Sequence, residues 1–166
     1  MPVNPLYLAL TSATLFCSLV AGLVFGFAVV VMPGIAKLDD RAFLSAFKQM
    51  DSIIQANHPA FMVVWVGSIF SVIVTAVLAT LSLHGGSLYL AWFATALYLV
   101  AVQLPTIRYN IPLNNALQRT DIATLTESEV ALTRARFEVP WNRWNRFRTL
   151  NAVVAVVAML TLLLTL

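Results

Sequence analysis

Long apolar runs and two polar stretches alternate along this 166-residue chain. Residues 1–36, 52–107 and 149–166 contain no Asp, Glu, Lys or Arg, and burying an unpaired charge in hydrocarbon costs several kcal/mol. A helix needs about 20 predominantly apolar residues to cross a bilayer. The pattern therefore predicts an all-α fold, a single integral membrane domain over residues 1–166 built as a four-transmembrane-helix bundle. The helices are expected at about residues 6–32, 61–83, 88–104 (extending toward 117) and 141–166.

The charged side chains fall in residues 37–51 and 108–148, and their signs predict an orientation. All ten Lys and Arg residues lie in these two stretches, and none lies in the short link at 84–87. Because cytoplasmic loops are enriched in Lys and Arg, we expect segments 33–60 and 105–148 on the cytoplasmic side. Both termini then lie on the non-cytoplasmic side of the plasma (inner) membrane. Polar chemistry is expected at the borders where the charged stretches stop.

The first connection is expected to form an amphipathic helix. Asp39 or Asp40 can cap a helix that runs to about Gln55. Its apolar residues recur at helical spacing: Phe43, Phe47, Met50 and Ile54. This helix is predicted to lie at the membrane surface or against the cytoplasmic end of the bundle.

The second long connection contains its own helix signals. Thr126 and Glu129 have capping-box spacing and predict a helix toward Glu138. Val139-Pro140 is expected to break this helix and to restart the chain as the last one, because proline suits the first turn of a helix.

Small residues repeat every four positions in the first two apolar segments, which predicts close helix packing in lipid. These residues are Ser18, Gly22 and Gly26 in the first segment, and Gly67, Ser71, Thr75 and Ala79 in the second.

Composition favours a membrane protein over a soluble or nucleic-acid-binding one. The chain is 60% hydrophobic and 10% charged, whereas soluble domains are about 25% charged. The net charge of +3 is explained by positive loops, so the expected partner is membrane lipid and not nucleic acid. Cys17 is the only cysteine, which excludes a disulfide within the chain.

Polar side chains converge near the cytoplasmic boundary. Three amides lie on one face of the third helix if that helix is continuous, and a tryptophan, an amide and an arginine lie on one face of the fourth. The candidate ligand-binding residues are Asn57, Gln103, Asn110, Asn114, Trp144 and Asn145, and the candidate catalytic residues are His58 and Arg148.

These residue types suit a pocket for a flat ligand with an oxygen atom. Trp144 offers a stacking surface, Arg148 and the amides can hold an oxyanion, and the imidazole of His58 can accept a proton. A purely structural network between the last two helices explains the same residues. The two histidines are expected on opposite membrane sides, so no metal site and no cofactor is predicted.

Several segments resemble those of a known family. They are Gly26-Phe27 through Val31-Met32-Pro33-Gly34, Ile54-Gln55-Ala56-Asn57-His58-Pro59-Ala60-Phe61, Leu104-Pro105-Thr106 with Asn110-Ile111-Pro112-Leu113-Asn114-Asn115, and Trp141-Asn142-Arg143-Trp144-Asn145-Arg146-Phe147-Arg148-Thr149. Over nearly the whole chain the sequence resembles the anthrone oxygenase-like family of small four-helix membrane proteins, whose bacterial members are largely of unknown function.

The resemblance implies a concrete chemistry, because fungal relatives oxidise anthrones to anthraquinones. Under that reading His58 is the base, Arg148 with Asn114 and Asn145 holds the oxyanion, and Trp144 is the stacking platform. We expect a protein that binds a small hydrophobic aromatic or quinone-like molecule, and whether it also oxygenates that molecule without a metal stays open. The alternatives are a non-enzymatic structural or accessory membrane protein and, less favoured, a small transporter. A homo-oligomer is compatible with the sequence.

Overall fold

The computed structural model describes residues 4–166, and every regular element in that range is helical. In chain order these elements are α1 (Pro5–Gly26), η1 (Phe27–Val31), α2 (Met32–Ile35), α3 (Asp40–Gln55), α4 (Pro59–Ser82), α5 (Gly85–Tyr98), η2 (Leu99–Gln103), η3 (Thr106–Asn110), α6 (Ile111–Arg119), η4 (Ile122–Thr124) and α7 (Glu127–Thr165). Consecutive elements join into four stretches that are long and apolar enough to span a membrane: Pro5–Ile35, Pro59–Ser82, Gly85–Arg119 and Glu127–Thr165. The predicted all-α fold with four candidate spanning helices is confirmed.

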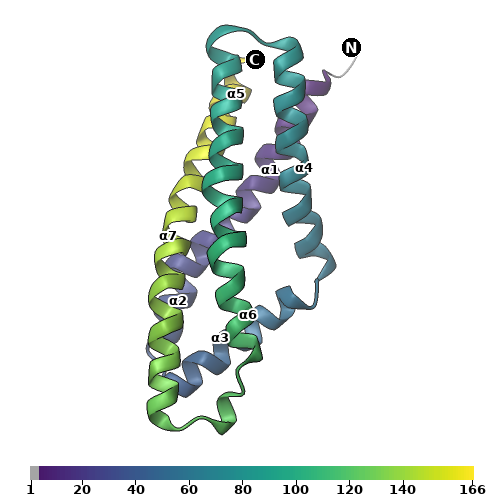
Figure 1. The fold of residues 1–166 in the computed structure, drawn as a ribbon. Coiled ribbons are helices and arrows are strands. Elements are labelled where there is room, and N and C mark those ends of the chain that lie inside the picture. Colours follow the sequence, from purple (N-terminus) through teal and green to yellow (C-terminus); the bar gives the residue numbers. More distant parts are fainter. Residues whose placement is uncertain (1–3) are drawn as a thin grey trace.

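The four stretches form one elongated bundle. The start of α1, the end of α7 and the α4–α5 link lie at one end, while α3 and the α6–α7 connection lie at the other (Figure 1). Helix α1 contacts both α4 and α7, and α5 contacts α7. Apolar side chains also cover the outside; Phe70 is 68% exposed and Leu81 is 76% exposed. Such a surface suits hydrocarbon rather than water, so the bundle fits an integral membrane protein in lipid.

Three π-helical segments interrupt the long helices, and each ends two residues before a proline. Segment η1 precedes Pro33, η2 precedes Pro105 and η3 precedes Pro112. In each case the residue directly before the proline donates its backbone N–H to the carbonyl five residues earlier. Proline has no N–H, and its ring clashes with the carbonyl four residues earlier. The wider turn therefore keeps the helix continuous past each of these prolines.

Pro140 is accommodated without a π-helical turn and lies inside the continuous helix α7. The break predicted at this position was wrong. Arg134 Nε donates to Glu138 Oε2 at 2.8 Å on one side of the proline. On both sides, the rings of Phe137 and Trp141 pack against α3. The ring contacts with α3 and the ion pair within α7 stabilise the helix against the roughly 3 kcal/mol that an interior proline costs.

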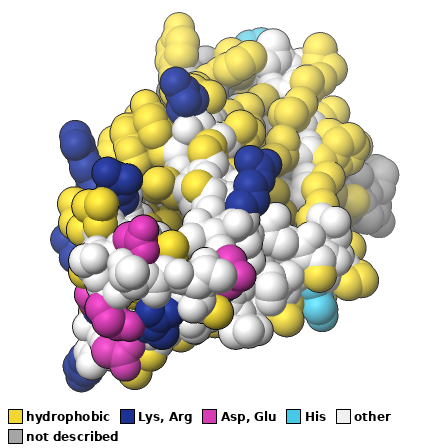
Figure 2. Space-filling model, turned by 60° about the horizontal axis from the view of Figure 1, so that its bottom comes forward, with side chains coloured by type: hydrophobic (Ala, Val, Ile, Leu, Met, Phe, Trp, Pro, Cys, Tyr) yellow, Lys and Arg dark blue, Asp and Glu magenta, His cyan; other side chains and the backbone are white. Residues whose placement is uncertain are grey.

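The charged stretches fold into a separate layer with its own apolar core, which we call the charged end. It consists of α3, α6, η4 and the first turns of α7. Figure 2 shows charged side chains gathered over this end of the molecule. The core beneath them contains Met32, Phe43, Leu44, Phe47, Leu117, Ile122, Val130, Phe137 and Trp141.

Helix starts at the charged end follow the sequence signals. Asp39 caps α3 by accepting a hydrogen bond from the Ala42 N–H at 2.8 Å. Thr126 and Glu129 form the predicted capping box at the start of α7. Both predicted N-termini are confirmed.

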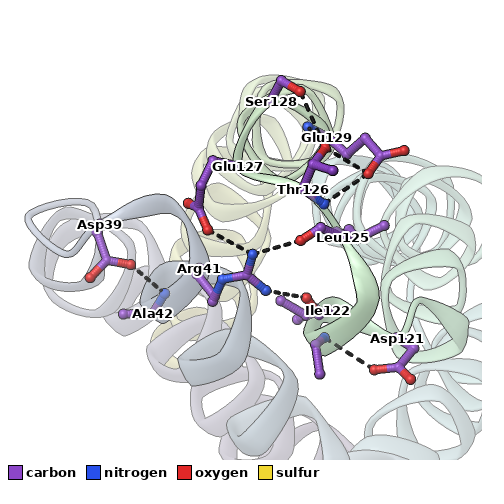
Figure 3. Close-up of polar contacts among 11 residues, drawn as sticks. Asp39, Arg41, Ala42, Asp121, Ile122, Leu125, Thr126, Glu127, Ser128 and Glu129 are labelled. Atoms are coloured by element: carbon purple, nitrogen blue, oxygen red, sulfur yellow. Dashed lines mark hydrogen bonds and ion pairs between the residues drawn. The ribbon is translucent and has the colours of Figure 1, made fainter.

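Arg41 joins these two helix starts (Figure 3). Its guanidinium donates to the backbone carbonyl of Ile122, to that of Leu125 at 2.7 Å, and to Glu127 Oε1 at 2.8 Å. The connection between α6 and α7 is therefore fastened to α3 through backbone carbonyls as well as through a charge pair.

The small residues of the second apolar segment mark a packed face, as predicted. Ser71, Thr75 and Ala79 are buried in α4. A Cβ atom added at Gly67 would lie 3.1 Å from the Phe16 ring of α1. Small side chains therefore permit α1 and α4 to approach each other closely.

The small-residue face predicted for the first segment was wrong. Ser18 and Gly22 are exposed, and a Cβ added at Gly22 or Gly26 would meet no atom within 4 Å. Helix α1 instead buries a neighbouring face with its own four-residue repeat of small side chains: Ala13, Cys17 and Ala21.

Candidate functional site

A cavity of about 270 Å³ lies where the charged end meets the spanning helices. Its wall is built by α1, η1, α3, α4, η3, α6 and α7 together with the loop before α4. Most of this wall is aliphatic or aromatic. The polar residues in the wall are Asp51, Asn57, Thr106, Asn110, Asn114 and Arg148. A mostly apolar cavity with a few convergent polar groups is the usual form of a small-molecule site.

Arg148 supplies the positive charge of the cavity and is only 7% exposed. Its Nη1 donates to Thr106 Oγ1 at 3.0 Å, while Nε and Nη2 both donate to Asn145 Oδ1, at 3.1 and 2.9 Å. Among residues 4–166 no Asp or Glu forms an ion pair with it. A guanidinium carries five N–H donors, so two remain available. A buried cation without a counter-ion is costly, which makes it a candidate for ligand binding.

Asp51 brings a carboxylate to the same cavity and is 2% exposed. Its Oδ1 accepts a hydrogen bond from Asn114 Nδ2 at 2.7 Å, and its Oδ2 accepts one from Gln118 Nε2 at 2.8 Å. The Oδ1 of Asn114 in turn accepts from Trp141 Nε1 at 2.8 Å. This chain of hydrogen bonds links α3, α6 and α7 and fixes the side of the cavity that faces the charged end.

Asn110 contributes an unused hydrogen-bond acceptor. It is 1% exposed, and its Nδ2 donates to the Trp141 carbonyl at 3.3 Å. Its Oδ1 is buried without a partner in the part of the chain that the structure describes. Because a buried polar atom without a hydrogen bond costs about 1–3 kcal/mol, this oxygen is suited to receive a donor from a bound molecule.

Two pairs of aromatic rings form parts of the cavity wall. Phe47 and Trp141 meet edge to face with centroids 5.3 Å apart. On α4, Phe61 and Trp65 are stacked with centroids 5.4 Å apart and ring planes 23° from parallel. Rings of this kind present flat apolar surface to a flat ligand. Charge, amides and aromatic surface are thus combined in one cavity.

Comparison with known proteins identifies the family. The family model described as anthrone oxygenase matches residues 58–158, which is more than half of the chain. This chain belongs to the anthrone oxygenase family. The resemblance carried by its motif segments is confirmed. A search of curated proteins gave no match, and a search of solved structures gave none.

The anthrone oxygenase match covers α4 to most of α7 and therefore most of the polar wall. Thr106, Asn110, Asn114 and Arg148 lie inside the matched range. Asp51 lies outside it, on α3.

The cavity gathers half of the residues that the sequence singled out. Four of the eight lie in its wall: Asn57, Asn110, Asn114 and Arg148. Asn145 stands directly behind Arg148, where its Oδ1 holds the guanidinium and its Nδ2 donates to the Val24 carbonyl at 3.0 Å. These contacts hold the guanidinium in place, and a role of Asn145 toward a ligand stays a prediction.

The other three predicted residues lie elsewhere. His58 directly precedes α4 and is exposed. Trp144 stacks on Tyr109 with centroids 3.7 Å apart, away from the cavity wall. Gln103 is buried in η2, and neither polar atom of its side chain has a partner among residues 4–166. Their roles toward a ligand stay predictions.

Sequence reasoning missed Asp51, Thr106 and Trp141 as members of the cavity. For Asp51 a signal was present: it lies four residues after Phe47 and eight after Phe43, on the apolar face of α3. It is also the last charge of the first charged stretch, as Arg148 is the last charge of the second. Both border charges therefore line one cavity.

Proposed function

We propose that this protein binds a small, flat, hydrophobic aromatic or quinone-like molecule in the cavity and oxygenates it, an anthrone being the type of substrate. The observation that carries the proposal is Arg148. It is a buried cation with no carboxylate partner among the described residues, at the wall of an aromatic-lined cavity. The family match supports the choice of substrate class.

The location of the cavity suits such a ligand. An anthrone is a flat apolar tricycle with one carbonyl oxygen, so it partitions into lipid. Trp65 and Phe61 on α4 offer it stacking surface. The two free N–H groups of Arg148 offer hydrogen bonds to its oxygen.

The chemistry needs no group beyond dioxygen and the side chains of the protein. Loss of a proton from the carbon opposite the carbonyl converts an anthrone to an enolate, which reacts directly with dioxygen. The negative charge of the enolate resides largely on its oxygen. Arg148, which is itself buried, is suited to stabilise this charge. Overall, one anthrone and one dioxygen give one anthraquinone and one water.

A binding measurement with a matched control tests the proposal. Arg148→Met removes the buried cation, and Arg146→Met removes an exposed arginine from the same helix. Titration of each detergent-solubilised variant with an anthraquinone, followed by quenching of tryptophan fluorescence, gives the affinity. Loss of hydrogen bonds to a charged group is worth about 1.5–3 kcal/mol, so Arg148→Met should bind roughly tenfold more weakly or worse.

The Arg146→Met variant should bind as the unchanged protein does. Oxygen uptake with an anthrone as substrate should likewise fall in Arg148→Met and stay unchanged in Arg146→Met. If the unchanged protein shows neither quinone binding nor oxygen uptake, the proposal fails and the structural reading of the polar residues is favoured. Equal affinity of the two variants would remove Arg148 from the site.

A further inference from the structure

Asp51 is a buried carboxylate without a positively charged partner. It is 2% exposed, lines the cavity, and forms no ion pair with Lys or Arg among residues 4–166. Its nearest basic neighbour along α3, Lys48, donates instead to the Thr120 carbonyl at 2.6 Å. A carboxylate that served only to join helices would gain from a cation in this low-dielectric position. The absence of one leaves the negative charge available to the cavity.

Amide groups hold this carboxylate in a fixed orientation and leave one position open. Asn114 donates to Oδ1 at 2.7 Å, whereas Gln118 at 2.8 Å and Gln55 at 3.3 Å both donate to Oδ2. An ionised carboxylate has about four lone-pair sites. Three are occupied, so one acceptor site remains, and it lies on Oδ1.

Arg148 and Asp51 come from different helices and carry opposite charges in the wall of the same cavity. They do not neutralise each other as an ion pair within 4 Å. A ligand that placed an oxygen at Arg148 and an acidic C–H near Asp51 would use both charges. The carbonyl of an anthrone and its acidic carbon lie across the central ring from one another, which matches this separation of roles.

From this geometry we propose that Asp51 is the proton acceptor of the oxygenation, an inference that rests on the function proposed above. Asp51 Oδ1 takes a proton from the carbon opposite the carbonyl, and the C–H electron pair becomes part of the enolate. That electron pair then forms a C–O bond to dioxygen, giving a peroxide anion that regains the proton from Asp51. Removal of the second proton from the same carbon, with cleavage of the O–O bond, forms the new carbonyl and releases water.

Proton transfer can be measured apart from oxygenation. In anaerobic D₂O an anthrone exchanges its acidic C–H for deuterium, and an enzyme with a base accelerates this exchange above the protein-free rate. Asp51→Asn should lower the enzyme-dependent exchange rate about 100-fold, in the range that general bases contribute. Its affinity for an anthraquinone, which has no such proton, should stay within about threefold of the unchanged protein.

Two further variants separate chemistry from folding and from the alternative base. Asp51→Glu keeps a carboxylate and should recover part of the exchange rate at equal or lower thermal stability, which a purely structural role would not produce. His58→Ala removes the exposed histidine and should leave exchange unchanged.

The possible outcomes distinguish failure of the role proposed for Asp51 from failure of the proposed function. Loss of exchange in His58→Ala with retention in Asp51→Asn would overturn the proposal while leaving the proposed function intact. An Asp51→Glu variant that binds the quinone yet exchanges no faster than Asp51→Asn would also overturn it. Absence of both quinone binding and exchange in the unchanged protein would instead refute the proposed function itself.

Discussion

Arg134 at the charged end and Arg148 at the cavity are both arginines of α7, but their surroundings differ. Arg134 donates to Asp40 at 2.9 Å and to Glu138 at 2.8 Å, and also to two backbone carbonyls. Its guanidinium also lies 4.3 Å from the Phe43 ring. Arg148 donates only to a hydroxyl and an amide oxygen, lies 5.6 Å from the centre of the Trp141 ring, and keeps two free donors. The fold pairs the charge of Arg134 with two carboxylates and uses four of its five N–H donors, whereas Arg148 has no carboxylate partner among the described residues and keeps two donors for a ligand.

The same contrast applies to packing in the two regions. Phe43 of the charged end is 0% exposed in a close-packed core, whereas Trp65 lines the cavity. Phe43→Ala should destabilise the protein by about 3–5 kcal/mol, seen as a large fall in the thermal midpoint in detergent. Trp65→Ala should cost much less stability and should weaken quinone binding. Equal destabilisation by the two substitutions would show that the cavity wall is as tightly packed as the charged end.

Replacement of Arg134 and of Arg148 by methionine should give the next largest difference in stability. Arg134→Met leaves Glu138 and Asp40 without their partner and should cost roughly 2–4 kcal/mol. Arg148→Met removes an unpaired buried charge but leaves buried Asn145 Oδ1 without its donors, and because these effects oppose each other, stability should change by less than about 1 kcal/mol in either direction. Thermal unfolding of both variants in one detergent measures the difference. A large loss in Arg148→Met would mean that the arginine is part of the scaffold.

Asn114 lies between the charged end and the cavity, and its substitution should cause an intermediate loss of stability. Asn114→Ala leaves both Asp51 Oδ1 and Trp141 Nε1 without their partner, at a cost of about 1–3 kcal/mol. Asn115→Ala on the same helix is the control, because the Asn115 side chain accepts only from the exposed Gln55. Chemical denaturation of the two variants should separate them; indistinguishable stabilities would contradict the chain of hydrogen bonds.

The fold could be predicted because one property, the cost of charge in hydrocarbon, acts on whole segments. Segregation of charge was enough for four spanning helices and for the all-α class, and the caps Asp39 and Thr126 followed from local chemistry. The continuity of α7 through Pro140 could not be predicted from local sequence. Whether a proline breaks a helix depends on packing of its neighbours against α3, which local sequence does not contain.

The sequence predicted a residue of the cavity wall only where position along the chain determines whether the side chain reaches the cavity. Arg148 lies at a border of charge, was singled out for that reason, and lies in the cavity wall. Gln103 and Asn110 were placed on one face by assuming a continuous α-helix. A π-helical turn between them adds one residue and rotates the register by about 100°, so only Asn110 reaches the wall. Asp51 was not singled out, although it is the last charge of the first charged stretch and lies on the apolar face of α3.

Asn110 has one side-chain atom with a hydrogen bond and one without among residues 4–166, and its substitution should have the smallest effect on stability. Its Oδ1 has no partner among the described residues, so Asn110→Leu removes one 3.3 Å hydrogen bond to the Trp141 carbonyl and one unsatisfied oxygen. Stability should change by no more than about 1 kcal/mol, because the two effects oppose each other. The affinity for a hydroxylated anthraquinone should fall more than the affinity for the parent quinone, since only the former donates to Oδ1. An equal change for both quinones would show that no ligand hydroxyl reaches this oxygen and that Asn110 serves the helix contact alone.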